Sequence, residues 1–149
     1  MRSLKKIKQV FLDMDGTIYH GTILYPTTLP FLHFLENRNI GYAFLSNNSS
    51  RNLKEYVRKL DRMGISTDTE HFYTSTEYCI DFLKKIHPEI TRVHILGMES
   101  IFPAFEAAGF RIDDETPQGV VVAFDRSLTY AKLCRTAWFL KQGVPGFAT

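Results

Sequence analysis

The stretch from Phe11 to Thr17 reads Phe-Leu-Asp-Met-Asp-Gly-Thr and decides the fold predicted for this chain. It follows Ile7 and Val10, so a short apolar run, typical of a buried parallel strand, precedes the two aspartates. Gly16 then allows the backbone to leave the strand sharply. We therefore predict a strand that ends at the aspartates.

Asp13 and Asp15 are predicted to share one orientation, because side chains two positions apart on an extended strand point the same way. In open α/β sheets, ligands bind in the crevice outside the carboxyl ends of the strands. Two carboxylates there can hold a hard divalent metal ion. Alternatively, one can attack phosphorus while the other handles the proton of the leaving group.

The Asp-x-Asp-Gly pattern also occurs in calcium-binding loops and in ordinary turns. An EF-hand loop would need a further acidic or amide ligand near Thr17 and a glutamate at its twelfth position. The residues after Gly16 are Thr, Ile, Tyr and His, which excludes that loop. An ordinary turn remains an alternative from the residues alone.

The composition is that of a globular protein, with 149 residues of which 44% are hydrophobic and 23% charged. The formal net charge of +2 is too small to indicate a nucleic-acid partner. We interpret the lysine cluster of Lys5, Lys6 and Lys8 as a solvated lead-in to the first strand. No run of residues has the length of a signal peptide or a membrane span, which predicts a cytoplasmic protein.

The two cysteines, Cys79 and Cys134, lie far apart in apolar surroundings and lack metal-ligand spacing. We predict that both are small core residues with reduced thiols.

Between the aspartates and the second strand we predict a hairpin and a helix. Gly21 is a turn residue between Ile18 and Ile23, and His20 in this hairpin is interpreted as a solvated or substrate-rim residue. The helix should run from Thr27 or Thr28 to Arg38 and end near Asn39. Its inward side is either Leu29, Leu32 and Leu35 or Phe31, Phe34 and Leu35.

The second strand, residues 42–45, ends in the run Ser46-Asn47-Asn48-Ser49-Ser50. Hydroxyl and amide groups that lead into a helix can gather hydrogen-bond donors around an anion, so Ser46 is predicted to bind phosphate. Ser49 or Ser50 is also predicted to cap a helix over residues 51–63, which ends at Gly64.

Further along, the patterns predict alternating helices and strands, and so an α/β fold. A strand near residues 71–73 precedes a helix that begins in the capping box Thr74–Glu77 and stops before Pro88. The remaining predicted elements are strands at residues 92–96 and 119–124 and helices at 98–108 and 130–141. Thr129 should cap the last helix, whose inward stripe is Tyr130, Leu133, Cys134, Ala137 and Leu140.

The run Asp13-Met14-Asp15-Gly16-Thr17 resembles the first motif of the haloacid dehalogenase superfamily, and Ser46 at the next strand end resembles the second. A loop, a helix and a strand account for all of residues 16–45, so no cap domain can lie between the two motifs. Any cap domain must follow the second motif. The residues around both motifs, and the run that begins Phe124-Asp125-Arg126, are similar to those of NagD-type and para-nitrophenyl-phosphatase-like enzymes. In this branch of the superfamily the cap follows the second motif.

This resemblance implies a Rossmann-like parallel core sheet with helices on both faces, in residues 1–74, and the first part of an α/β cap in residues 75–149. It implies a magnesium-dependent phosphatase for a small phosphorylated metabolite such as a sugar phosphate or nucleotide. Asp13 would be the nucleophile that forms an aspartyl-phosphate, and Asp15 the acid and base. Ser46 and the backbone N–H of Asn47 would bind phosphate, and the Asp13 carboxylate and Asp15 carbonyl would bind Mg²⁺.

The family's third-motif lysine and fourth-motif acidic cluster have no counterpart here, so the chain resembles the N-terminal half of such an enzyme. Two alternatives follow: a catalytically incomplete protein that binds phosphate or a protein partner, and a phospho-accepting signalling domain. In the family the first strand is central, so here it should lie at a sheet edge, which predicts self-association of residues 1–149. The missing lysine and metal carboxylate predict negligible phosphatase activity for residues 1–149 alone. The roles of Asp125 and Arg126 are left open.

Overall fold

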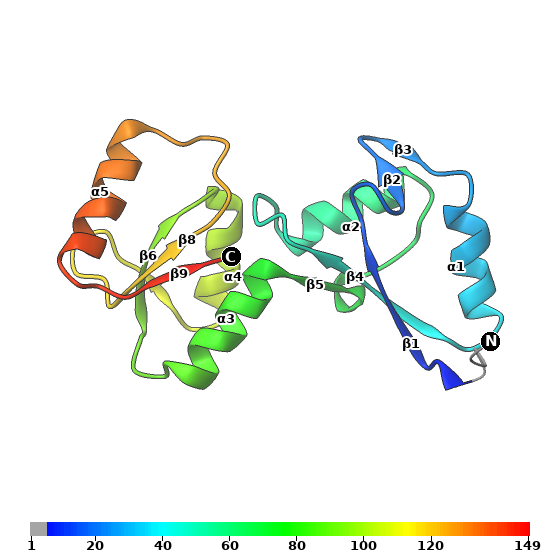
Figure 1. The fold of residues 1–149 in the computed structure, drawn as a ribbon, viewed down its shortest axis with the longest axis horizontal. Helices are drawn as coiled ribbons and strands as arrows, with labels where there is room; N and C mark the ends of the chain where they lie inside the picture. Colours follow the sequence, from blue (N-terminus) through cyan, green and yellow to red (C-terminus); the bar gives the residue numbers. More distant parts are fainter. Residues whose placement is uncertain (1–5) are drawn as a thin grey trace. The chain divides into compact units, whose positions relative to one another are not determined.

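The structure is a computed structural model that describes residues 6–149. Of the predicted lysine lead-in, Lys5 lies outside the described residues. The chain forms two compact units: Met1–Ser46 with Leu53–Tyr73, and Asn47–Asn52 with Thr74–Thr149 (Figure 1). The short segment between β4 and α2 thus groups with the second unit, although its flanking elements belong to the first.

The first unit is built on a three-stranded sheet in the order β1-β4-β5. β1 (Gln9–Asp13) pairs in parallel with β4 (Gly41–Ser46), and the sheet continues to β5 (Phe72–Thr74). Between β1 and β4 lie the hairpin of β2 (Tyr19–His20) and β3 (Ile23–Leu24) and the helix α1 (Thr28–Glu36). α2 (Leu53–Arg62) and the 3₁₀ turn η2 (Thr69–His71) connect β4 to β5. The predicted hairpin and first two core strands are confirmed.

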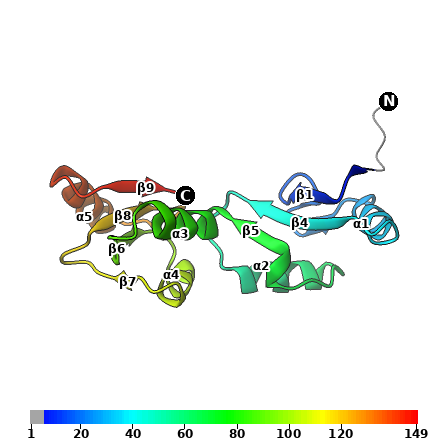
Figure 2. The same cartoon turned by 90° about the horizontal axis from the view of Figure 1, so that it is seen from below.

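The helices of the first unit cover one face of its sheet. Leu12 of β1 and Phe44 of β4 are register partners and share a core cluster with Leu32 of α1 and Leu60 of α2. Figure 2 shows α2 lying along one side of β4 and β5. Side chains alternate between the faces of a strand, so Phe11 points the other way, and it is 63% exposed.

The helix α1 settles the choice between its two predicted inward sets. Leu32 and Leu35 are buried, so the leucine set is right except at Leu29, which is 36% exposed. Phe31 and Phe34 are 40% and 41% exposed, so the set containing both phenylalanines is wrong. The helix ends close to Asn39, whose φ of 52° is the left-handed conformation that asparagine tolerates and helices cannot continue.

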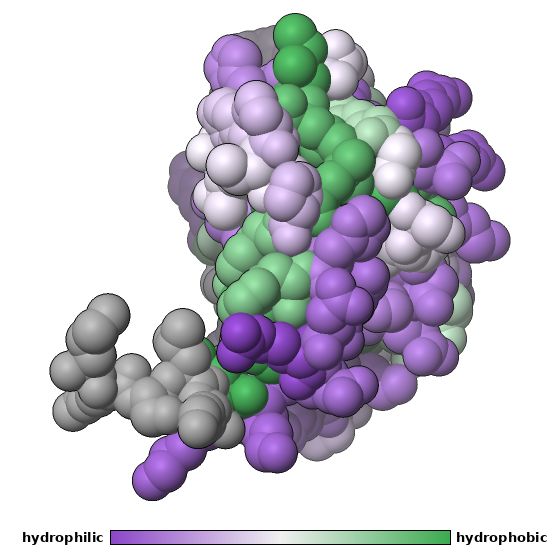
Figure 3. Space-filling view, turned by 90° about the vertical axis from the view of Figure 1, so that its right-hand side faces the viewer, coloured by the Kyte–Doolittle hydropathy of each residue, from purple (hydrophilic) through white to green (hydrophobic). Residues whose placement is uncertain are grey.

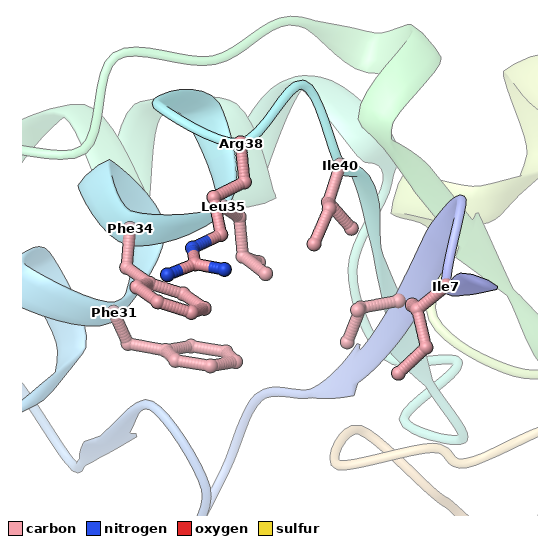
Figure 4. A pocket seen from close by; sticks show the side chains of 7 residues that line it. Ile7, Phe31, Phe34, Leu35, Arg38 and Ile40 are labelled. Carbon is pink, nitrogen blue, oxygen red and sulfur yellow. The ribbon is translucent and has the colours of Figure 1, made fainter. Parts of the chain in front are cut away.

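β1 lies at the edge of its sheet, as predicted, because among residues 6–149 it pairs with no strand other than β4. Beside it, α1 and β1 form a groove of about 180 Å³ (Figure 4), and Figure 3 shows a band of apolar side chains on this side of the molecule. At the rim of this groove, the Arg38 guanidinium lies 4.7 Å from the centre of the Phe34 ring. The groove is lined by Ile7, Val10, Phe31, Phe34, Leu35, Arg38 and Ile40.

The second unit contains a four-stranded parallel sheet in the order β7-β6-β8-β9. Its strands are β6 (Arg92–Leu96), β7 (Arg111–Ile112), β8 (Gly119–Val122) and β9 (Gly146–Ala148). Its helices are α3 (Ser75–Ile86), α4 (Phe102–Ala107) and α5 (Tyr130–Lys141), with a 3₁₀ turn η3 (Glu99–Ile101) before α4. The mixed α/β class with parallel strands is thereby confirmed.

Helices lie on both faces of this second sheet. Val93 and Ile95 of β6 pack with residues of α3 and α4, including Leu83 and Phe105. The intervening His94 faces α5, where its ring contacts Phe139 and its Nε2 lies 2.9 Å from the hydroxyl of Thr136. β6 is therefore buried on both sides, which is in keeping with its apolar residues Val93, Ile95 and Leu96.

Three predictions for the second unit need correction or detail. The predicted inward stripe of α5 is wrong, because its buried residues are Thr136 and Phe139, and Cys134 is exposed rather than in the core. Cys79 is buried, and burial raises the pKa of its thiol to about 11. The helix predicted over residues 98–108 begins as a 3₁₀ turn, since Pro103 fits only in the first turn of an α-helix.

The predicted capping residues of α3 and α5 are confirmed. The Thr74 hydroxyl accepts a hydrogen bond from the Thr76 N–H and donates one to the Glu77 carboxylate. The Thr129 hydroxyl accepts the Lys132 N–H. No helix among residues 6–149 has the length and apolar character needed to cross a membrane.

Candidate active site

The register of β1 and β4 brings the two sequence motifs to the same edge of the first sheet. Asp13 pairs with Leu45, so Ser46 lies one position beyond the level of Asp13, where both parallel strands end. The register thus places Asp13 and Ser46 at the same edge of the sheet. Their chemical roles remain predictions.

Asp15 lies in a tight turn that leads from β1 into β2. Gly16 adopts a φ of 85° and its N–H donates to the Tyr19 carbonyl over 2.8 Å. The turn therefore returns the chain beside Asp15, and the Tyr19 hydroxyl donates to Asp15 Oδ2 over 3.3 Å. Only glycine adopts the required backbone conformation without strain, so Gly16 is needed for this arrangement.

Lys59 is a neighbour of Asp15 that sequence reasoning missed. It lies on α2, and its Nζ is 3.7 Å from Asp15 Oδ1 and 3.6 Å from the centre of the Tyr19 ring. The lysine side chain is only 18% exposed, whereas that of Asp15 is 57% exposed. Nothing local in the sequence indicates this pair, because 44 positions separate the two residues.

Ser46 is held at the end of β4 by a tyrosine of α2. Its Oγ lies 3.1 Å from the hydroxyl oxygen of Tyr56, which is 1% exposed. A side chain in contact with a buried partner is restricted in rotation, so Ser46 is suited to present its hydroxyl in one direction.

Asn47 and the residues after it are held by the second unit. The Ser75 hydroxyl donates to the Asn47 carbonyl over 3.3 Å. Buried Ser49 accepts hydrogen bonds from the Phe124 N–H over 2.9 Å and from the Thr149 hydroxyl over 2.6 Å. The predicted helix cap at Ser49 or Ser50 is therefore wrong: α2 begins only at Leu53, and the Ser50 hydroxyl donates to Asn48 Oδ1.

Three further residues named from the sequence are His20, in the first unit, and Asp125 and Arg126, in the second. His20 is exposed in the β2–β3 hairpin. In the second unit, Asp125 closes a turn by accepting hydrogen bonds from Ser127 and from Lys132 Nζ, the latter over 2.9 Å. Burial alone would raise the pKa of Asp125, but these hydrogen bonds together lower it. The Asp125 carboxylate therefore stabilises the turn that leads into α5. Arg126, the next residue, is exposed.

A metal ion would find hard oxygen donors at the end of β1. The Asp13 and Asp15 carboxylates and the Asp15 carbonyl are the type of ligand that Mg²⁺ prefers. Residues 6–149 contain no group of three or more His, Cys, Asp or Glu side chains arranged to hold a metal ion. These oxygen donors are of the type that binds magnesium, and they supply some of the ligands that the ion needs.

Comparison with known proteins assigns the family. A model of the haloacid dehalogenase-like hydrolases matches residues 10–111. The chain belongs to this family, as the two strand-end motifs predicted.

Individual relatives of this chain are named as phosphatases or nucleotidases. An acid sugar phosphatase of Staphylococcus saprophyticus is 31% identical over 147 residues, which are 98% of this chain and 56% of the relative. The 5'-nucleotidase YutF of Bacillus subtilis is 30% identical, and the match covers 98% of this chain and 57% of the nucleotidase. The solved structure of a 4-nitrophenylphosphatase from Thermotoga maritima matches with a TM-score of 0.90 and 38% identity, over 97% of this chain and 55% of its own. The chain spans a little over half the length of these relatives.

Proposed function

We propose that this chain carries the nucleophile, the acid–base residue and a phosphate ligand of a magnesium-dependent phosphatase that hydrolyses a small phosphate monoester. The observation that supports the proposal most directly is the register of β1 and β4, which sets Asp13 and Ser46 at one sheet edge. Relatives named for sugar phosphates, nucleotides and 4-nitrophenyl phosphate support a phosphorylated small molecule as substrate.

In the proposed reaction, Asp13 attacks phosphorus and the bond from phosphorus to the leaving oxygen breaks. Asp15 gives its proton to that oxygen and later removes a proton from the water that hydrolyses the aspartyl-phosphate. Ser46 and the backbone N–H of Asn47 donate hydrogen bonds to the phosphoryl oxygens. Asp13 and the Asp15 carbonyl would hold Mg²⁺, which offsets negative charge on the phosphoryl oxygens when bound.

We also propose the domain assignment that the resemblance implies. The first unit would be the N-terminal part of the hydrolase core, and residues 75–149 the first part of a cap. A cytoplasmic location remains a prediction from the sequence.

The test measures release of phosphate from a panel of sugar phosphates, nucleotides and 4-nitrophenyl phosphate, with Mg²⁺, by the 149-residue chain. We expect turnover far below that of a full-length phosphatase relative assayed beside it, in line with the negligible activity predicted for residues 1–149 alone, and complete loss of the remaining turnover in Asp13→Asn. Asp13→Asn should also fail to form a phosphoenzyme with acetyl phosphate.

The outcomes separate this proposal from its alternatives. Equal phosphate release by wild type and Asp13→Asn, together with measurable phosphate binding, would favour a catalytically incomplete binding protein. A label on Asp13 that persists for minutes or longer without turnover would favour a phospho-accepting signalling domain.

A further inference from the structure

The carboxylate of Asp15 contacts two side chains, one at each oxygen. Lys59 Nζ lies 3.7 Å from Oδ1, and the Tyr19 hydroxyl donates to Oδ2 over 3.3 Å. A carboxylate that is held at both oxygens by groups from two different elements has little freedom to rotate about its side-chain bonds.

The two side chains that hold Asp15 also contact each other. Lys59 Nζ lies 3.6 Å from the centre of the Tyr19 ring, within the range of a cation–π interaction. Tyr19 is completely buried and the Lys59 side chain is 18% exposed, so this contact is shielded from water. Shielding strengthens interactions of a charge with a ring or a carboxylate.

Both contacts are set by well-packed parts of the first unit. Lys59 stands directly before Leu60, which is fully buried in the core cluster that also contains Tyr19. Tyr19 is joined to Asp15 by a β-bridge and by the turn at Gly16. The ammonium group and the phenol therefore occupy fixed positions on either side of a carboxylate that is itself 57% exposed and accessible to a ligand.

We propose that Lys59 is a positioning residue for Asp15: with Tyr19, it holds the exposed carboxylate in the one orientation from which Asp15 exchanges a proton with the substrate's leaving oxygen. The inference rests on the proposed phosphatase function for its consequence in turnover. Lys59 also supplies a positive charge beside Asp15 from α2, a helix that the sequence motifs do not include.

The direct test measures the rotamer of Asp15 by NMR, at one neutral pH, from three-bond couplings between its backbone and its Cγ. We expect couplings of a single rotamer in the wild type and in Lys59→Arg, which keeps a cation on a long stem. Lys59→Met keeps the stem without the charge and should give averaged couplings. Lys54→Met, an exposed lysine on the same helix, should match the wild type.

The kinetic test uses Asp13-dependent phosphate release by the same four proteins and by Tyr19→Phe. Misplacing a catalytic group costs up to about a hundredfold, so we expect kcat to fall by roughly tenfold to a hundredfold in Lys59→Met with KM nearly unchanged. Lys59→Arg should recover most of this loss. Tyr19→Phe, which keeps the ring and loses only the hydroxyl, should show a smaller fall.

The results separate failure of this inference from failure of the proposed function. Averaged Asp15 couplings in the wild type, or unchanged couplings in Lys59→Met, would overturn the positioning role whatever the turnover. Absence of Asp13-dependent turnover combined with the expected couplings would overturn the phosphatase proposal while leaving the Lys59–Asp15 relationship established. If Lys59→Met does not fold, Lys59→Gln takes its place, and it too should give averaged Asp15 couplings because it lacks the charge.

Discussion

The hydroxyl oxygens of Ser46 and Tyr56 lie 3.1 Å apart, which joins the predicted phosphate ligand at the end of β4 to a buried tyrosine of α2. A Tyr56 hydroxyl that donates to Ser46 Oγ would orient Ser46 toward an anion at the sheet edge. Its effect on phosphate binding should then be smaller than that of Ser46 itself, because Tyr56 acts through Ser46.

Ser46→Ala should weaken phosphate handling without unfolding the protein. Loss of a neutral donor to a charged oxygen costs on the order of 1.5–3 kcal/mol, or roughly tenfold to a hundredfold in kcat/KM or in affinity for inorganic phosphate. Tyr56→Phe should have a smaller effect in the same direction. Unchanged kinetics and phosphate affinity in Ser46→Ala would reduce Ser46 to a strand terminus.

Asp15→Asn should remove most turnover while leaving Mg²⁺ binding close to that of the wild type. The proposed metal contact of Asp15 is its main-chain carbonyl, which the substitution retains, whereas the acid–base group is lost. Calorimetric titration with Mg²⁺ and measurement of kcat test the two halves. Loss of Mg²⁺ affinity along with turnover would mean that the Asp15 side chain is itself a metal ligand.

Asp113 should make folding of the second unit sensitive to acid. The N–H groups of Thr116 and Glu115, and then the charges of Arg111 and Arg92, lower the pKa of this buried carboxyl. A carboxyl whose pKa is lower in the folded than in the unfolded state stabilises the folded protein at pH values above its unfolded-state pKa, about 3.9 for aspartate. That contribution is lost as the pH falls through the folded-state value.

The measurement compares urea unfolding of wild type and Asp113→Asn from pH 7 downward. The wild type should be the more stable at pH 7, and the difference should shrink below about pH 4. A difference that stays constant over this range would show that the carboxylate charge does not contribute.

Thr136→Val should destabilise the second unit more than Thr136→Ser. The Thr136 hydroxyl lies 2.9 Å from Nε2 of buried His94, whose Nδ1 lies 2.7 Å from Asp114 Oδ1. Valine keeps the shape but leaves a buried ring nitrogen without that partner, which costs about 1–3 kcal/mol, whereas serine keeps the hydroxyl. Thermal or urea unfolding measures the difference, and equal stability of the two variants would contradict it.

Residues 1–149 should self-associate through the edge of β1. The exposed Phe11 and the adjacent apolar groove present the kind of strand edge and surface that pair with another chain. Phe11→Lys should lower the associated fraction, whereas Leu128→Lys, at an exposed apolar residue of the second unit, should not. Sizing chromatography with light scattering measures this, and a wild-type monomer at all concentrations would refute the prediction.

The positions of the core strands followed from local patterns. A continuous apolar run that ends in aspartates and glycine predicts a strand followed by a turn, and so β1 was predicted, although only its Leu12 is buried. Its edge location was predicted from the family resemblance. The strand β6 was likewise predicted from a local pattern, since three of its five residues, Val93, Ile95 and Leu96, are apolar. Neither prediction required knowledge of distant contacts.

The errors arose where distant contacts choose between local alternatives. α5 has several apolar residues around its circumference, and the face that is buried is the one whose Thr136 bonds His94 of β6. Likewise, Lys59 is one of several lysines and arginines on α2, and only the tertiary fold shows that it lies against Asp15. Periodicity alone could not identify either residue.

The segment Asn47–Asn52 makes the second unit discontinuous in the gene. Ser49 is 1% exposed and is held by the Phe124 N–H and the Thr149 hydroxyl, so a separately expressed fragment 74–149 would lack a buried part of its own interior. The shortest continuous fragment that encodes the whole unit begins at Asn47 and carries α2 with it. A recombination event between codons 52 and 74 would therefore divide the second unit between two parent genes. An exchange of the second unit among relatives keeps that unit intact only when the crossover precedes codon 47.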